Sequence, residues 1–279
     1  MIIDKNIILE RDGKKPILID VFYDELKTNQ PIVIFCHGYK GYKDWGAWNL
    51  MAEHIAAAGF CVIKFNFSHN GGTMENPIDF PDLEAFGHNN YTKELDDLED
   101  VITWAQNRFE SNSNINSNKI CLIGHSRGGG ITILKASEDP RITKLITLAS
   151  VSDFGNRFGT ENEIKQWKED GVKYVVNGRT KQQMPHYYQF YEDFKANENR
   201  LHIASAEKRL TIPHLIIHGS KDTSVKISEA EALHTWNPNS EFKIVDDADH
   251  VFNTKHPWHK NELSNELYEV CDLIVSFLK

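Results

Sequence analysis

The sequence has few cysteines, no long apolar run and no excess of positive charge. Its four cysteines form no CxxC pair, so neither a zinc knuckle nor a redox dithiol is indicated. Cys36, Cys61 and Cys121 lie inside apolar runs, which predicts buried free thiols. No segment approaches the roughly 18 apolar residues of a membrane span, and the N-terminus lacks the apolar stretch of a signal peptide. We therefore expect a cytoplasmic protein without a membrane partner.

The formal net charge of −9 argues against nucleic acid as a partner, because phosphate binding needs an excess of lysine and arginine. Hydrophobic residues make up 40% of the 279 positions, enough for a large core. His250, His256 and His259 lie close together, but no separate carboxylate or thiolate set completes a zinc site. We expect no metal and no cofactor, and the oligomeric state stays open.

Short apolar runs alternate with amphipathic segments along most of the chain. The apolar runs are typical of buried parallel strands and cover residues 31–38, 60–67, 118–126, 144–150, 212–219 and 241–250. The amphipathic segments predict helices at about residues 45–58, 91–109, 128–137 and 225–235, and a last helix ending near Leu278. Together they predict an α/β fold with a doubly wound, mostly parallel sheet of about eight strands, which begins with a hairpin around Asp12-Gly13.

The helix expected at residues 91–109 carries an acidic run. Its apolar stripe contains Leu95, Leu98, Ile102 and Ala105. The acidic side chains are expected on the solvated side of the helix, and they are not expected to bind a metal. They are Glu94, Asp96, Asp97, Glu99 and Asp100.

The alternation breaks between residues 153 and 208, where the chain is polar, charged and aromatic, with helical periodicity. We therefore expect a core formed by residues 1–152 and 209–279, with residues 153–208 inserted as a helical cap. The aromatic side chains of the cap could line a substrate pocket or form the cap's own small core. The candidate substrate-binding residues are Trp167, Tyr187 and Tyr188 of the cap, with Gly38 and His125 of the core.

The sharpest local signal is Gly124-His125-Ser126-Arg127-Gly128, which lies between an expected strand and an expected helix. A serine on such a tight turn takes a strained backbone conformation that lifts its hydroxyl above the sheet. Glycines two residues away on either side avoid a steric clash. This context predicts that Ser126 is a nucleophile.

A serine hydroxyl needs a base, and the base needs an orienting acid. His250 is the best-placed histidine, because it follows the run EFKIVDDAD at the exit of the last expected strand. Asp222 follows the strand at 212–219 and is the expected acid, with Asp153 as its rival. The oxyanion of the intermediate also needs N–H donors. We expect these donors to be the backbone N–H groups of Tyr39 and Arg127.

Taken together, these residues resemble the α/β-hydrolase superfamily over nearly the whole chain. The matching segments are His37-Gly38, 124–128, 218–222 and Asp249-His250, in the chain order serine, acid, histidine. The segment FNFSHNG (65–71), followed by the acidic helix, is similar to bacterial feruloyl/cinnamoyl esterases and dienelactone-hydrolase-like proteins. That branch usually reads DxxGxG in this loop, whereas this sequence has asparagine and histidine at the aspartate and at the first glycine.

The resemblance implies a carboxylic-ester hydrolase that needs no cofactor and forms an acyl-enzyme on Ser126. The expected substrate is a small or medium ester, with an aromatic or hydrophobic acid as one option. A serine peptidase, amidase or thioesterase could use the same three residues, since the chemistry at the carbonyl is shared. A non-catalytic ligand-binding protein on the same fold is the third reading. An intact serine, aspartate and histidine argue against it, because a binding protein has no need for all three.

Overall fold

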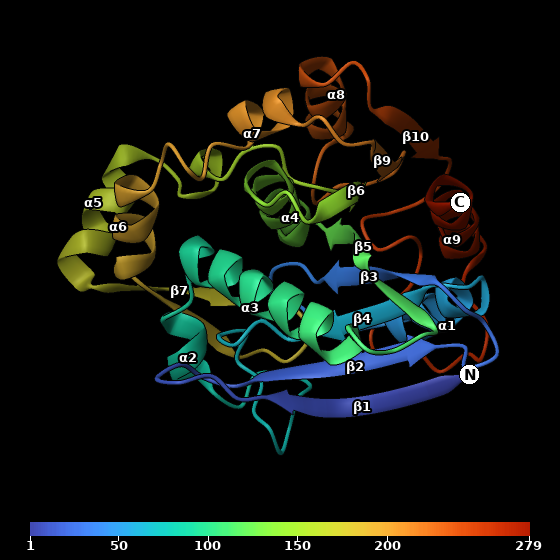
Figure 1. The fold of residues 1–279 in the computed structure, drawn as a ribbon. Coiled ribbons are helices and arrows are strands. Elements are labelled where there is room, and N and C mark those ends of the chain that lie inside the picture. Colours follow the sequence, from blue (N-terminus) through green and yellow to red (C-terminus); the bar gives the residue numbers. More distant parts are fainter.

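The computed structural model describes residues 1–279 and contains an eight-stranded sheet with helices on both faces (Figure 1). The strand order is β1-β2-β4-β3-β5-β6-β9-β10. The strands are β1 (Ile2–Leu9), β2 (Ile17–Tyr23), β3 (Gln30–Cys36), β4 (Cys61–Phe65), β5 (Ile115–His125), β6 (Ile142–Leu148), β9 (His214–Gly219) and β10 (Glu241–Val245). Strands β1 and β2 form an antiparallel hairpin, β2 runs antiparallel to β4, and the remaining pairs are parallel. The predicted doubly wound, mostly parallel sheet is confirmed.

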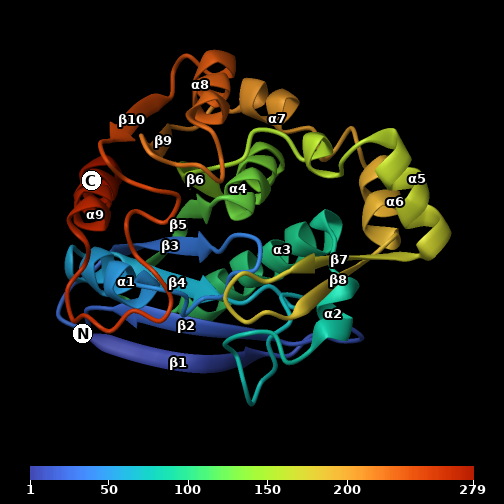
Figure 2. The same ribbon diagram turned by 180° about the vertical axis from the view of Figure 1, so that it is seen from behind.

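Each face of the sheet carries its own hydrophobic core. Helices α1 (Trp48–Ala57) and α9 (Asn265–Leu278) cover one face (Figure 2). The other face is covered by α3 (Tyr91–Phe109), α4 (Arg127–Glu138) and α8 (Ile227–Trp236). Strand β3 shows why both faces are apolar, because Ile32 and Ile34 face one core while Val33 faces the other. All four cysteines are buried and unpaired, as predicted for three of them. None of the helices combines the length and hydrophobicity that crossing a lipid bilayer requires.

Two of the acidic residues on α3 are buried, which corrects the expectation that the whole run faces water. Glu94 and Asp97 are 3% and 2% exposed. Asp97 forms an ion pair with Arg11 and accepts hydrogen bonds from the backbone N–H and the hydroxyl of Ser68. Glu94 forms an ion pair with Arg127, the residue after the predicted nucleophile. Both carboxylates are therefore paired charges inside the fold.

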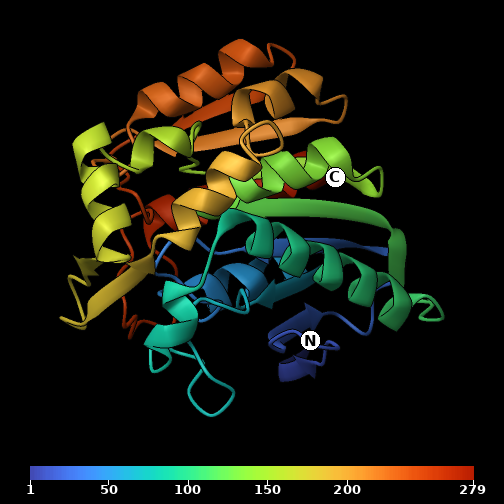
Figure 3. The same cartoon turned by 90° about the vertical axis from the view of Figure 1, so that its left-hand side faces the viewer.

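The segment 153–208 lies at one end of the molecule and contains more than helices (Figure 3). Its elements are the 3-10 helix Gly155–Arg157, α5 (Glu161–Asp170), β7 (Val172–Val176), β8 (Gln183–Tyr187), α6 (Gln189–Ala196) and α7 (Ile203–Arg209). The expectation of a purely helical cap is wrong, because β7 and β8 pair as an antiparallel hairpin. The short helix α2 (Leu83–Gly87), which was also not predicted, lies against this hairpin, with the Tyr187 ring packed on Gly87.

Candidate active site

Ser126 lies on a strained turn between β5 and α4. Its φ and ψ are 56° and −120°, a combination that L-residues rarely adopt. The neighbouring glycines make this turn possible. A Cβ at Gly124 would collide with the Gly128 carbonyl and the Thr132 hydroxyl, and one at Gly128 would lie 2.5 Å from the Cys36 carbonyl oxygen. The strand-turn-helix context predicted from the sequence is therefore present, and it lifts the Ser126 side chain above the sheet.

The Gly128→Ala variant is expected to unfold at a markedly lower temperature than the wild type. The new methyl group would meet two backbone carbonyl oxygens of the turn after β3, which cannot rotate away as a side chain could. We expect a loss of about 2 kcal/mol or more in the free energy of unfolding. Thermal denaturation of the variant measures the loss. Gly178→Ala is the control, because nothing lies within 4 Å of a Cβ there. Equal melting temperatures for the two variants would contradict this account of the turn.

Ser126, His250 and Asp222 form one hydrogen-bonded chain, although 124 positions separate the serine from the histidine. The Oγ of Ser126 lies 3.1 Å from Nε2 of His250, and Nδ1 of His250 lies 2.7 Å from Oδ2 of Asp222. The geometry follows from the topology, because all three residues leave the carboxyl ends of parallel strands at one edge of the sheet. With Nδ1–H of His250 donating to the carboxylate, Nε2 is free to accept the serine proton.

Asp222 is held ionised by its surroundings. Its Oδ1 accepts backbone N–H groups from Ser224 and Val225, and its Oδ2 lies 3.3 Å from Nε2 of His218. Burial alone would raise the pKa of Asp222, but the hydrogen bonds from His218 and His250 outweigh it and hold the pKa well below its usual value. The carboxylate is thus positioned to stabilise a protonated His250. The rival Asp153 lies elsewhere and accepts a hydrogen bond from the backbone of Asn156.

His125 holds the loop that carries His250. Its Nε2 lies 2.9 Å from the carbonyl oxygen of His250, and the two rings lie 4.8 Å apart. Burial and the neighbouring His250 lower the pKa of His125 to about 3, so the ring is neutral. A neutral ring that donates from Nε2 carries no proton on Nδ1, the atom that faces Gly38. His125 is therefore a positioning residue for His250.

Buried neutral histidines predict that the protein loses stability in mild acid. Burial is the largest cause that lowers the pKa of His37 to about 4 and the pKa values of His125 and His186 to about 3. In the unfolded chain a histidine pKa is about 6.5, so the unfolded state binds protons below that pH and the folded state does not. The resulting stability is complete above pH 6.5 and is lost as the pH falls toward 4.

Denaturant titrations of the wild type and His125→Gln at several pH values between 7.5 and 4.5 test this prediction. Well below pH 6.5, each such histidine contributes a slope of up to about 1.4 kcal/mol per pH unit. Glutamine keeps a hydrogen-bond donor but does not titrate, so we expect a shallower slope for the variant. Parallel stability curves for the two proteins would show that His125 does not stay neutral in the folded state.

Two backbone N–H groups beside Ser126 have no backbone acceptor and are candidates for binding an oxyanion. Neither the N–H of Tyr39, in the turn after β3, nor that of Arg127, at the start of α4, donates to a backbone acceptor. Both residues border the space around the Ser126 hydroxyl. Gly38 keeps this space open, because a Cβ there would lie 2.9 Å from Cβ of Ser126. The oxyanion role that the sequence predicted for these two N–H groups stays a prediction.

The sequence matches the prolyl oligopeptidase family, Peptidase_S9, over residues 52–269. The chain belongs to this family. Together with its fold, this membership makes the protein a serine hydrolase of the α/β-hydrolase type. No curated protein has a sequence that matches this chain significantly.

Several solved structures share the fold of this prolyl oligopeptidase family member over nearly their whole length. Est1E from Butyrivibrio proteoclasticus has a TM-score of 0.70 at 14% identity, with 99% of this chain and 98% of that chain covered. A putative hydrolase from Agrobacterium vitis S4 has a TM-score of 0.74 at 17% identity, and both chains are covered completely. A monoacylglycerol lipase from Paleococcus ferrophilus has a TM-score of 0.65 at 16% identity, with 94% of this chain and 98% of that chain covered. At such identities the likeness shows the fold alone.

Two cavities of this family member meet at Ser126 and His250. One has a volume of about 500 Å³ and includes Gly38, His125, Trp48 and Arg179 in its wall. The other, of about 620 Å³, lies under the segment 153–208 and is called the aromatic cavity below. Its apolar wall consists of Tyr39, Tyr91, Val151, Phe154, Phe158, Val175, Phe190 and Val225. Hydrolysis needs space on both sides of the bond that is cleaved, and this arrangement provides it.

The three aromatic residues proposed from the cap sequence do not line either cavity. Trp167 is 2% exposed, contacts Phe158 and donates its Nε1–H to the His186 carbonyl at 2.7 Å. Tyr188 packs edge-on against Trp167, and Tyr187 lies outside, on Gly87. The assignment of these residues to substrate binding is therefore corrected, because Trp167 and Tyr188 pack within the segment and Tyr187 packs on α2.

Besides Tyr39, the aromatic residues that do line the cavity come from three parts of the chain. Tyr91 begins α3, Phe154 and Phe158 follow β6, and Phe190 belongs to α6. Tyr91 and Phe154 stack at 3.8 Å with 9° between their planes. Sequence reasoning missed these residues, since nothing local shows that they converge. The one available signal was the position of Tyr91 at the start of the apolar stripe of α3.

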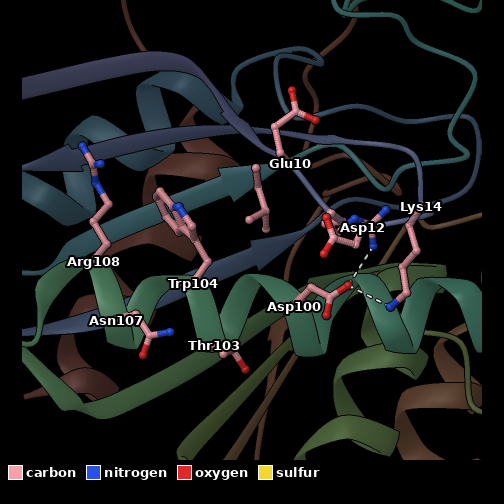
Figure 4. A pocket seen from close by; sticks show the side chains of 10 residues that line it. Glu10, Asp12, Lys14, Asp100, Thr103, Trp104, Asn107 and Arg108 are labelled. Carbon is pink, nitrogen blue, oxygen red and sulfur yellow. Dashed lines mark hydrogen bonds and ion pairs between the residues drawn. The ribbon is translucent and has the colours of Figure 1, made fainter.

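A third hollow, of about 790 Å³, lies over α3 and the turn after β1 (Figure 4). Asp100 extends from α3 and pairs with Lys14 and Arg11 of that turn. Most of its lining is polar, and it contains none of the residues Ser126, Asp222 and His250. This hollow therefore has no part in the chemistry of the active site.

Proposed function

We propose that the protein hydrolyses carboxylic esters through Ser126, His250 and Asp222. The observation that carries this proposal is the continuous hydrogen-bonded chain from the serine hydroxyl through the imidazole to an ionised carboxylate. His250 accepts the proton of Ser126 as the hydroxyl attacks the ester carbonyl. The N–H groups of Tyr39 and Arg127 stabilise the negative charge that develops on the carbonyl oxygen.

The protonated His250 then donates its proton to the leaving alcohol, and an acyl group remains on Ser126. Asp222 stabilises the imidazolium during this step. A water molecule, deprotonated by His250, attacks the acyl-enzyme and releases the acid, which restores the serine hydroxyl. The cycle uses only side chains and backbone groups of this protein and water.

The cavities favour an ester of small or medium size, with an aromatic or hydrophobic acid as one option. The aromatic cavity has ring faces on several sides and opens at Ser126. Est1E, which shares the fold with a TM-score of 0.71 at 16% identity, has been solved with ferulic acid bound. Aryl esters of benzoate, cinnamate, butyrate and acetate test this point. A clear preference for acetyl esters would remove the aromatic acid from the proposal.

A peptidase or amidase is the second candidate, and the match to the prolyl oligopeptidase family favours it. A matched ester, thioester and amide that share one acyl group and one leaving-group skeleton separate the candidates. The ester proposal predicts the highest kcat/KM for the ester, with acyl-enzyme detectable by mass spectrometry in rapid-quench samples. The peptidase function replaces the ester proposal if the amide is cleaved and the ratio of kcat/KM for the ester to that for the amide does not exceed the ratio of their intrinsic reactivities.

A further inference from the structure

The charge inside the aromatic cavity is opposite to that of the whole protein. The chain has a formal net charge of −9, yet the side chains that line this cavity include two lysines, two arginines and no carboxylate. Acidic residues outnumber basic ones over the chain as a whole. The absence of acidic residues from this wall therefore indicates which charge the ligand of the cavity carries.

The two arginines are already neutralised by carboxylates behind the wall. Arg127 lies 3.4 Å from Glu94, and Arg157 lies 2.6 Å from Glu229. Lys40 and Lys173 differ from them, because neither forms a direct ion pair, although Glu163 lies near enough to Lys173 to favour its charged form. The cavity therefore has one lysine, Lys40, on which no carboxylate acts, and a second, Lys173, whose charge Glu163 balances only from a distance.

Lys173 is half-buried on β7, opposite His186 in the register of the hairpin. Its Nζ lies 3.8 Å from the centre of the Trp167 ring and 3.4 Å from the Phe158 carbonyl oxygen. These contacts fix the direction of the side chain but use only part of the hydrogen-bonding capacity of the ammonium group. Burial lowers the pKa of Lys173, which shows that the charge is partly removed from water.

Lys40 occupies a backbone position that favours glycine. The turn after β3 is closed by a hydrogen bond from Gly41 N–H to the Gly38 carbonyl, and Lys40 has a φ of 54° within it. Lys40 therefore has a long side chain at a position whose left-handed backbone conformation is unfavourable for most residues other than glycine. Its Nζ lies 5.0 Å from the Tyr39 ring, and the residue borders both cavities beside the reacting serine.

We propose that the substrate is an anionic ester, whose carboxylate binds Lys40 and Lys173 in the aromatic cavity. This inference rests on the proposed ester hydrolysis and names the class of ester. Partly buried ammonium groups without a directly paired carboxylate are costly, and a carboxylate on the substrate would supply that partner. A cationic group, such as the free amino terminus of a peptide, would be repelled from the same cavity.

Two matched pairs of esters test the proposal on either side of the scissile bond. In one pair the charge is on the acid: anionic phenyl 4-carboxybenzoate is compared with neutral phenyl 4-carbamoylbenzoate. The other has it on the alcohol, as the butyrate ester of 3-hydroxybenzoate against that of 3-hydroxybenzamide. The amides are neutral and nearly the same size. In one of the two pairs we expect kcat/KM to be about ten-fold higher for the carboxylate.

Lysine variants show whether this preference comes from the two side chains. Lys40→Gly suits the left-handed turn and removes the charge, and Lys173→Met keeps most of the apolar stem. Each should reduce the preference several-fold, measured as the ratio of kcat/KM for the two esters of one pair. Lys40→Arg should retain the preference. Lys165→Met, on the exposed side of α5, is the control and should behave as the wild type does.

The outcomes separate this inference from the function on which it rests. If no ester is turned over although Ser126 reacts with a fluorophosphonate, ester hydrolysis itself is wrong. If the esters are hydrolysed but neither carboxylate is preferred, only the anionic substrate is wrong. If Lys40→Gly and Lys173→Met slow both members of a pair equally, the lysines stabilise the reaction in general, and the proposal is likewise overturned.

Discussion

Replacing Ser126 with alanine is expected to reduce kcat for an aryl ester by about 10⁶-fold. The residual rate would come from the oxyanion site and substrate binding alone, because alanine has no oxygen to attack the carbonyl. The strained turn is set by Gly124 and Gly128, so the variant should fold as the wild type does. Steady-state kinetics and the far-ultraviolet circular dichroism spectrum check both points.

Ser137→Ala is the matched control for this substitution. Ser137 lies on the same helix, and its hydroxyl donates only to the Leu134 carbonyl. We expect activity within a factor of two or so of the wild type, as for other substitutions away from functional groups. Substantial ester turnover by Ser126→Ala, from a preparation shown to be free of wild-type enzyme, would mean that another group performs the chemistry.

Asp222→Asn is expected to lower kcat by about 10⁴-fold with little change in KM. The asparagine amide can donate a hydrogen bond to Nδ1 of His250, which favours the tautomer with its proton on Nε2. That tautomer cannot accept the proton of Ser126. The variant also removes the negative charge that stabilises the imidazolium.

The rival carboxylate provides the control for this experiment. Asp153→Asn removes the negative charge but keeps an oxygen that can accept the backbone N–H of Asn156, and neither group contacts the triad. We expect kcat within a few-fold of the wild type for this variant. A large loss of activity in Asp153→Asn together with near-normal activity in Asp222→Asn would show that the acid is Asp153 and not Asp222.

The parts of the fold that depend on local patterns could be predicted from the sequence. The apolar runs at β3, β5 and β9 have the composition of strands buried on both faces, and the stripe of α3 has helical spacing. Residues at the carboxyl ends of such strands converge on one edge of the sheet. This rule is sufficient to predict from the sequence that Ser126, Asp222 and His250 lie close together.

The parts that depend on long-range packing could not be predicted. The hairpin β7–β8 is short and lies on a polar segment, so its strands carry no apolar alternation. Glu94 sits among acidic neighbours, and only the nearby Arg127 guanidinium shows that it faces inward. The wall of the aromatic cavity combines rings as far apart in the sequence as Tyr39 and Phe190, and it forms where segment 153–208 packs on α3.

The substrate-binding residues illustrate the same limit. Trp167 and Tyr188 were plausible because aromatic side chains often line pockets, but a segment of this size also needs its own apolar core. In this protein Trp167 makes that core with Phe158 and Tyr188. Composition alone cannot distinguish a ring that faces a ligand from one that faces its neighbours.

The central claim is tested most directly by labelling the folded protein with a fluorophosphonate and mapping the modified peptide by mass spectrometry. We predict one adduct per chain, on Ser126, which is absent in Ser126→Ala and forms far more slowly in His250→Gln. Failure of the folded wild-type protein to react, or stable modification of a different residue with Ser126 untouched, would contradict the account.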